Sequence, residues 1–108
     1  MGYVYLLLEV DKDGFERHKI GITKNSVEKR LAQLQTGNSN KISILHVYQS
    51  TNYKKIEKWL HNEFIPKKTE AENEWFTLDD DDVIGFNILC NKADKTINFL
   101  KETNHFYK

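Results

Sequence analysis

Four side chains of different chemistry follow one another along this chain and together could cleave a phosphodiester bond. They are the phenol of Tyr5, the ammonium of Lys19, the guanidinium of Arg30 and the carboxylate of Glu57. Phosphodiester hydrolysis needs a base for the nucleophile, charge stabilisation for the transition state and help for the leaving oxygen. Arg30 offers five N–H donors and stays protonated, which suits it to the transition state. The set therefore predicts phosphoryl chemistry.

Glu57 has the surroundings of a metal ligand. It lies between the apolar residues Ile56 and Leu60, at the border of the buried stripe of a predicted helix. Tyr53, Glu57 and His61 are spaced four residues apart, so the three side chains project from neighbouring positions. A half-shielded carboxylate of this kind suits one Mg²⁺ or Mn²⁺ that keeps several waters. His61 could act beside it or be a structural histidine, and both roles stay open.

A β-hairpin must position the first two of these side chains. Residues 3–10 and 15–22 predict its strands, and residues 11–14 predict its turn. Period-two alternation gives the core face the aliphatic residues Val4, Leu6, Leu8, Val10, Ile20 and Ile22. It gives the opposite face the residues Tyr3, Tyr5, Arg17 and Lys19. A polar, aromatic face separated from the core is what a site built on a sheet surface needs.

A helix is predicted after the hairpin. Asn25 as N-cap and Glu28 three residues later form a capping-box pattern, and Gly37 suits the C-terminal end of this helix. Residues 42–48 are apolar and partly β-branched, which predicts a third strand. Residues 52–65 return to helical spacing and end at a proline.

For the rest of the chain, the sequence predicts a loop, a short apolar segment and a C-terminal helix. Residues 66–74 are polar and predict a loop, and residues 75–76 (Trp-Phe) form a short apolar anchor. Four aspartates at 79–82 suit the negatively charged first turn of a C-terminal helix over residues 79–104. These elements predict a single domain of the α/β (α+β) class over residues 1–108, with a small three-stranded antiparallel sheet flanked by helices.

The charge is unevenly distributed along the chain. The net charge is zero, but residues 1–68 carry twelve Lys or Arg against seven Asp or Glu, while residues 69–108 carry four against nine. A basic face opposed to an acidic one can attract a polyanion, although charge also varies along ordinary surfaces. The side chains expected to face a nucleic acid are Lys24, Lys29, Lys54, Lys55 and Lys58, with Tyr3.

Cysteine content and hydropathy narrow the class of protein further. The single cysteine, Cys90, excludes an internal disulfide and a cysteine-based zinc site, and it lies on an apolar stripe where it would fill core space. No apolar run approaches the ~20 residues that span a bilayer, and the start of the chain lacks the features of a secretory signal. A reducing cytoplasm is therefore expected.

The order of these motifs resembles the GIY-YIG nuclease superfamily, most closely its phage and viral branch, over residues 2–78. The segments that carry the likeness are Tyr3-Val4-Tyr5, Lys19-Ile20-Gly21, Arg30-Leu31, the Glu-x-x-Leu-His of 57–61 and Glu74-Trp75-Phe76. The resemblance implies that Tyr5 is the first-motif tyrosine, Gly21 the close-packing glycine, Arg30 the transition-state arginine and Glu57 the metal ligand.

The chain departs from the superfamily pattern at two positions. Lys19 replaces the second tyrosine, and Leu34 stands where many members carry a histidine. A lysine can replace the phenol as a base or by orienting water, and His61 could compensate for the missing histidine. Asn73 could correspond to a late asparagine of the superfamily.

The resemblance implies a metal-dependent endonuclease that acts on DNA, with RNA not excluded. Water activated by Tyr5 or Lys19 would attack phosphorus, Arg30 would stabilise the phosphoryl oxygens, and an ion on Glu57 would stabilise the leaving 3′-oxygen. The alternative is a nucleic-acid-binding or interaction module on the same fold without turnover, which the neutral net charge favours. The domain leaves no room for a DNA-recognition domain, so a homodimer or a partner protein could supply specificity.

Overall fold

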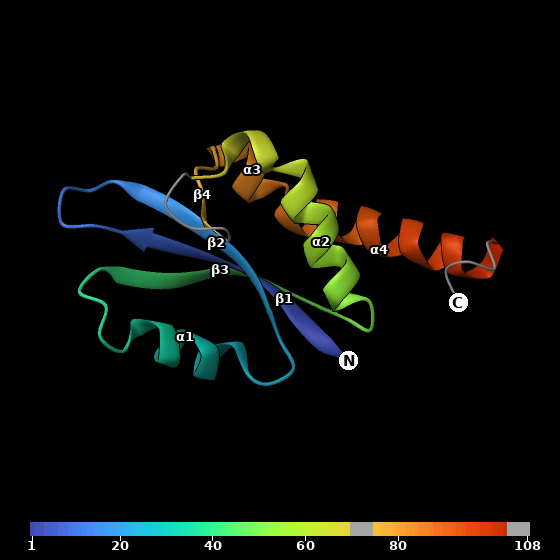
Figure 1. Cartoon of the computed structure of the whole chain (residues 1–108), viewed down its shortest axis with the longest axis horizontal. Coiled ribbons are helices and arrows are strands. Elements are labelled where there is room, and N and C mark those ends of the chain that lie inside the picture. The colour runs from blue at the N-terminus through green and yellow to red at the C-terminus, as the bar shows by residue number, and fades with distance from the viewer. Residues whose placement is uncertain (70–74, 104–108) are drawn as a thin grey trace.

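A computed structural model describes residues 1–69 and 75–103 (Figure 1). The elements, in chain order, are β1 (Gly2–Val10), β2 (Glu16–Thr23), α1 (Val27–Gln35), β3 (Lys41–Ser50), α2 (Tyr53–Glu63), the 3₁₀ helix η1 (Ile65–Lys67), β4 (Trp75–Phe76), α3 (Asp80–Ile84) and α4 (Phe86–Thr103). The strands form one antiparallel sheet in the order β3-β1-β2-β4. The α+β class is confirmed, but the sheet has four strands rather than three. The expected apolar anchor at 75–76 is itself a strand that pairs with His18 and Lys19.

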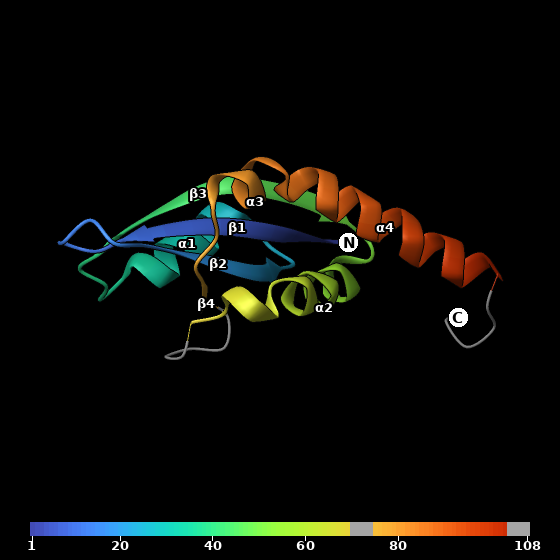
Figure 2. The same cartoon turned by 90° about the horizontal axis from the view of Figure 1, so that it is seen from above.

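Helices cover both faces of the sheet and divide the core into two clusters. On one face, α1 closes a smaller cluster, which consists of Tyr5, Leu7, Val27 and Ile42. On the other face, α2, α3 and α4 close a larger cluster, to which β1 and β2 contribute Val4, Leu6 and Ile20. The strand β1 is therefore buried on both of its faces. In Figures 1 and 2, α4 extends beyond the end of the sheet.

Three of the six residues predicted for the core face are only half-buried. Val4, Leu6 and Ile20 are fully buried as expected, whereas Ile22 is half-buried. Leu8 and Val10 are half-buried as well. They lie toward the end of the β1–β2 hairpin, which extends past α3 and α4 in Figure 1. The alternation gave their face correctly, but no helix reaches far enough to cover them.

The start of α1 differs by one residue from the expectation. Ser26, not Asn25, is the N-cap, because its Oγ accepts a hydrogen bond from the Lys29 backbone N–H at 3.2 Å. The Ser26 hydroxyl also donates to Glu28 at 2.8 Å, so the expected capping box does not form. The end of the helix is confirmed: Gly37 has φ +75°, the left-handed conformation that glycine adopts readily after a helix.

The acidic run at 79–82 caps a helix, as predicted. Asp79 and Asp82 form a reciprocal capping box at the start of α3. The ammonium of Lys67 lies 3.1 Å from the Asp79 carboxylate and also bonds Asp82. The expected single C-terminal helix is interrupted at Gly85, so α3 and α4 are separate elements, and residue 104 lies outside the described residues.

The other expectations for the C-terminal half are met in part. Pro66 does not directly end α2, which finishes at Glu63; it lies inside η1. Cys90 is fully buried in the larger cluster, and burial raises the pKa of its thiol to about 12. It fills core space, as predicted. Within the described residues, no helix is both long and apolar enough to cross a membrane.

A buried histidine makes the stability of the fold depend on pH. His18 on β2 is 4% exposed, and its Nδ1 accepts a hydrogen bond from the Leu78 backbone N–H at 3.3 Å. Burial lowers the pKa of His18 below its usual 6.5, with Glu16 opposing the shift. The unfolded chain therefore binds more protons than the folded protein below about pH 6.5.

We expect the contribution of His18 to the free energy of unfolding to be complete above its unfolded pKa. It should be lost as the pH falls through the lower, folded pKa. Urea unfolding of the parent and of His18→Gln, measured between pH 7.5 and pH 5, tests this. The glutamine can still accept a bond from Leu78 but does not titrate, so its stability should fall less steeply. Parallel curves for the two proteins would contradict the assignment.

Candidate active site

Tyr5 and Gly21 are in direct contact across β1 and β2. They are register partners, and a Cβ on Gly21 would overlap the Tyr5 hydroxyl oxygen. The hydroxyl end of the ring thus occupies the space that a side chain at position 21 would take, and only glycine fits there. Tyr5 is 1% exposed, so the expectation of an open polar face is wrong at this position, because α1 covers it.

Lys19 lies on the same face as Tyr5, as the alternation predicted. Its register partner is Leu7, two residues beyond Tyr5 on β1. Its Nζ is 5.3 Å from the centre of the Trp75 ring, and the guanidinium carbon of Arg17 is 4.0 Å from the same ring. The two cations thus share one aromatic ring supplied by β4. Lys19 is 6% exposed, so β4 shields it from solvent.

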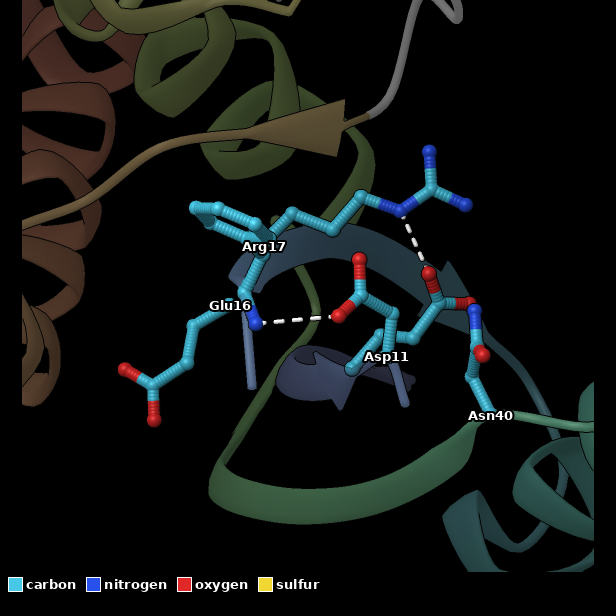
Figure 3. A pocket seen from close by; sticks show the side chains of 6 residues that line it. Asp11, Glu16, Arg17 and Asn40 are labelled. Atoms are coloured by element: carbon cyan, nitrogen blue, oxygen red, sulfur yellow. Dashed lines mark hydrogen bonds and ion pairs between the residues drawn. The ribbon is translucent and has the colours of Figure 1, made fainter. Parts of the chain in front are cut away.

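A buried carboxylate fixes Arg17 beside Lys19. The Arg17 Nε donates to Glu9 Oε1 at 2.5 Å, the bond marked by a dashed line from Arg17 in Figure 3. Asn38 Nδ2 donates to the other oxygen of Glu9 at 2.8 Å. Burial alone would raise the pKa of Glu9, but these hydrogen bonds outweigh it and hold the pKa below its usual value. The end of the sheet beside Lys19 is therefore held together by an ion pair and hydrogen bonds.

Arg30 lies on α1 and lines a pocket of about 230 Å³. The other lining residues are Ile22, Thr23, Asn25, Ser26, Lys29 and Gln33. Arg30 Nη1 donates to Gln33 Oε1 at 3.3 Å, whereas Arg30 Nε is buried and has no hydrogen-bond partner within the described part of the chain. A buried donor without an acceptor costs about 1–3 kcal/mol. Because Nε is itself buried, an oxygen of a ligand could reach it only if the surrounding side chains move.

His61 attaches α2 to the outer edge of β2. Its Nε2 is 3.0 Å from the Ile20 carbonyl oxygen, and because a carbonyl can only accept, Nε2 carries the proton. The imidazole also packs edge-on against Phe76, with ring centres 5.1 Å apart. These contacts give His61 a structural role, whatever else it does.

Glu57 lies on α2, on the opposite face of the sheet from Tyr5 and α1. The Tyr53 ring packs on Gly2, near the Thr23 end of β2, while His61 contacts Ile20, so α2 runs antiparallel to β2. Glu57 precedes His61 by four residues, which is about 6 Å along the helix. Two residues of a strand span about the same length. Glu57 is therefore level with residue 22, which lines the Arg30 pocket. It is half-buried, on the border of the stripe as predicted.

A metal ion at Glu57 would have few ligands from the described residues. Among residues 1–69 and 75–103, no group of three or more His, Cys, Asp or Glu side chains could hold a metal ion. A single carboxylate, Glu57, would need waters and phosphate oxygens to complete the coordination shell. Mg²⁺ commonly binds in this way.

The predicted nucleic-acid-binding side chains occupy several places. Lys24, Lys54 and Lys55 line one pocket, together with Lys101 of α4, which sequence reasoning missed. The other predicted residues lie elsewhere: Lys29 lines the Arg30 pocket, Lys58 is exposed on α2, and Tyr3 is half-buried beneath α1. Asn73 and Glu74 lie outside the described residues.

Comparison with protein families places this arrangement in a known group. The model of the T5orf172 domain matches residues 2–100. The chain belongs to the T5orf172 domain family. T5orf172 is a phage-associated domain related to nuclease-type folds. The match runs through most of α4, so this helix is part of the T5orf172 domain and not an appendage. Comparisons with curated proteins and with solved structures gave no match.

Proposed function

We propose that this T5orf172 domain is a metal-dependent endonuclease of the GIY-YIG type, which hydrolyses phosphodiester bonds in DNA. The observation that carries the proposal is a pocket beside α1 that brings Arg30 together with Lys29. Two cations at one pocket favour an anionic ligand, and a guanidinium can donate to several oxygens at once. A phosphodiester has such oxygens.

The chain's own residues would share the work as follows. Arg30 donates to the non-bridging oxygens of the scissile phosphate and stabilises the charge of the transition state. A deprotonated Tyr5 or Lys19 would accept a proton from the attacking water, or either side chain would orient this water, near Gly21. Mg²⁺ or Mn²⁺ bound to Glu57 would supply Lewis-acid stabilisation of the leaving 3′-oxygen.

One observation favours the alternative, a nucleic-acid-binding module without turnover. The two candidate bases, Tyr5 and Lys19, are 1% and 6% exposed. A base that activates water must be reachable by that water. If α1 and β4 never open over these side chains, the domain would bind nucleic acid through Arg30 and the lysines but would not cut it.

A plasmid-nicking assay separates the two functions. Supercoiled DNA is incubated with the purified protein and Mg²⁺, Mn²⁺ or EDTA, and an RNA substrate is run in parallel. We expect metal-dependent nicks in DNA and none in EDTA. Intact DNA with both metals, at protein concentrations that saturate binding, would establish the binding module instead.

A further inference from the structure

Four lysines from three separate segments line one pocket of about 350 Å³. Lys24 follows β2, Lys54 and Lys55 begin α2, and Lys101 lies near the end of α4. The remaining lining residues are Met1, Thr51, Asn52 and Tyr53. None of the described residues that line it is acidic, so the pocket gathers positive charge in a protein whose net charge is zero.

Lys101 is held in place by a buried side chain. Asn52 is 3% exposed, and its Oδ1 accepts a hydrogen bond from Lys101 Nζ. Asn52 Nδ2 donates to Asp94 Oδ1 and to Asn98 Oδ1, both at 2.7 Å. Asp94 Oδ1 accepts a further bond from the Ser50 hydroxyl at 2.9 Å. This network joins β3 to α4 and keeps one ammonium at the wall of the pocket.

Several of these lysines lie where local electrostatics disfavour positive charge. Like charges that converge repel one another, and Lys54 and Lys55 stand in the first turn of α2, where the helix dipole disfavours cations. That turn carries no acidic residue. Local departures from stabilising patterns are typical of functional sites. A phosphate group in the pocket would turn the repulsion into attraction.

The lysine pocket adjoins the Arg30 pocket. Thr23 and Asn25 line the Arg30 pocket, while Lys24 between them lines the lysine pocket, so the two pockets flank the same short loop. Resting on the proposed function, we propose that the lysine pocket binds a phosphate group. The DNA strand bound at Arg30 supplies this phosphate from a nucleotide beyond the cleaved bond, and Lys101 is one of the residues that bind it.

The test compares two lysines of the same helix. Lys101→Gln removes a charge from the pocket, and Lys95→Gln removes one from an exposed position on α4 that does not line it. A labelled oligonucleotide is titrated without metal at several salt concentrations, and pyrophosphate is titrated by calorimetry. Lys101→Gln should weaken both ligands and lower the salt slope for the oligonucleotide by about one. Lys95→Gln should change little. Lys24→Gln, on a different segment, should reproduce the effect.

The outcomes are distinct from those of the cleavage assay, because binding is measured without metal. If Lys101→Gln and Lys95→Gln weaken ligand binding equally, the effect comes from the overall charge of the protein, and the proposed phosphate site is wrong. If Lys101→Gln binds both ligands as tightly as the parent does, the proposed phosphate site is also wrong, even if the parent cleaves DNA. If Lys101→Gln loses pyrophosphate binding but binds the oligonucleotide as the parent does, the pocket binds free phosphates and not the DNA strand. A parent that never cleaves, with oligonucleotide binding lost in Lys101→Gln, would refute the nuclease but support the pocket.

Discussion

Replacing Arg30 by alanine should lower DNA cleavage by about a hundredfold or more and leave the melting temperature almost unchanged. On the proposed mechanism, the rate falls because the guanidinium donors that would face the transition state are removed. The melting temperature should stay because, within the described residues, the Arg30 side chain makes one hydrogen bond, of 3.3 Å to Gln33, and its buried Nε has no acceptor. Truncation therefore removes an unfavourable buried donor along with some packing. Single-turnover cleavage and thermal unfolding of the same sample measure both effects.

Two further variants sharpen the Arg30 experiment. Arg30→Lys should not restore the parental rate, because an ammonium cannot reproduce the planar fork of donors. Lys29→Ala, which removes the neighbouring cation of the same pocket, should weaken DNA binding more than it slows the bound complex. If Arg30→Ala cleaves at the parental rate, Arg30 has no part in the mechanism. A large fall in melting temperature would instead make it a structural residue.

Replacing Glu57 by glutamine should abolish metal-dependent cleavage, with a loss on the order of a hundredfold or more, while the fold stays intact. Glutamine keeps the size of the side chain but removes the charge that would hold Mg²⁺ or Mn²⁺. DNA binding in EDTA should be equal or tighter, because a negative charge close to the phosphates has gone. Cleavage rates over a range of Mg²⁺ concentrations, together with binding in EDTA, measure this.

Glu63 provides the matched control for Glu57. It lies on the same helix, α2, but is exposed at its C-terminal end. Glu63→Gln removes the same charge and should leave both the rate and the dependence on Mg²⁺ unchanged. Parental cleavage by Glu57→Gln would show that the ion is not held by this carboxylate. Equal losses in the two variants would indicate an effect of overall charge.

Local patterns predicted the hairpin well because its signal lies within twenty residues of sequence. Alternation placed Tyr5, Lys19 and Arg17 on one face, and the observed register pairs their strands accordingly. Alternation does not show what covers a face. Tyr5 is buried because α1 folds back over β1, and that packing depends on residues far along the chain. The sequence thus predicted a shared face but not its exposure.

Three features of the structure were not predicted, because no pattern in the nearby sequence indicates them. The strand β4 has two residues, too few to show a period. Asn25 and Ser26 are both good N-caps, and only the hydrogen bond to Lys29 distinguishes them. Lys101 joins the other lysines through Asn52, which is 49 residues away in sequence. No pattern within a window of helical length could connect those two positions.

The two hydrophobic clusters differ in how firmly they hold their helices. In α1 only Val27 is buried, whereas α4 buries Phe86, Cys90, Ala93 and Ile97. Lifting α1 from the sheet therefore exposes far less apolar surface than detaching α4, and segments with few buried contacts open at lower free energy. Hydrogen exchange should accordingly be faster in α1. The helix that bears Arg30 also covers Tyr5, so its transient opening would let water reach the buried phenol while the rest of the domain stays folded.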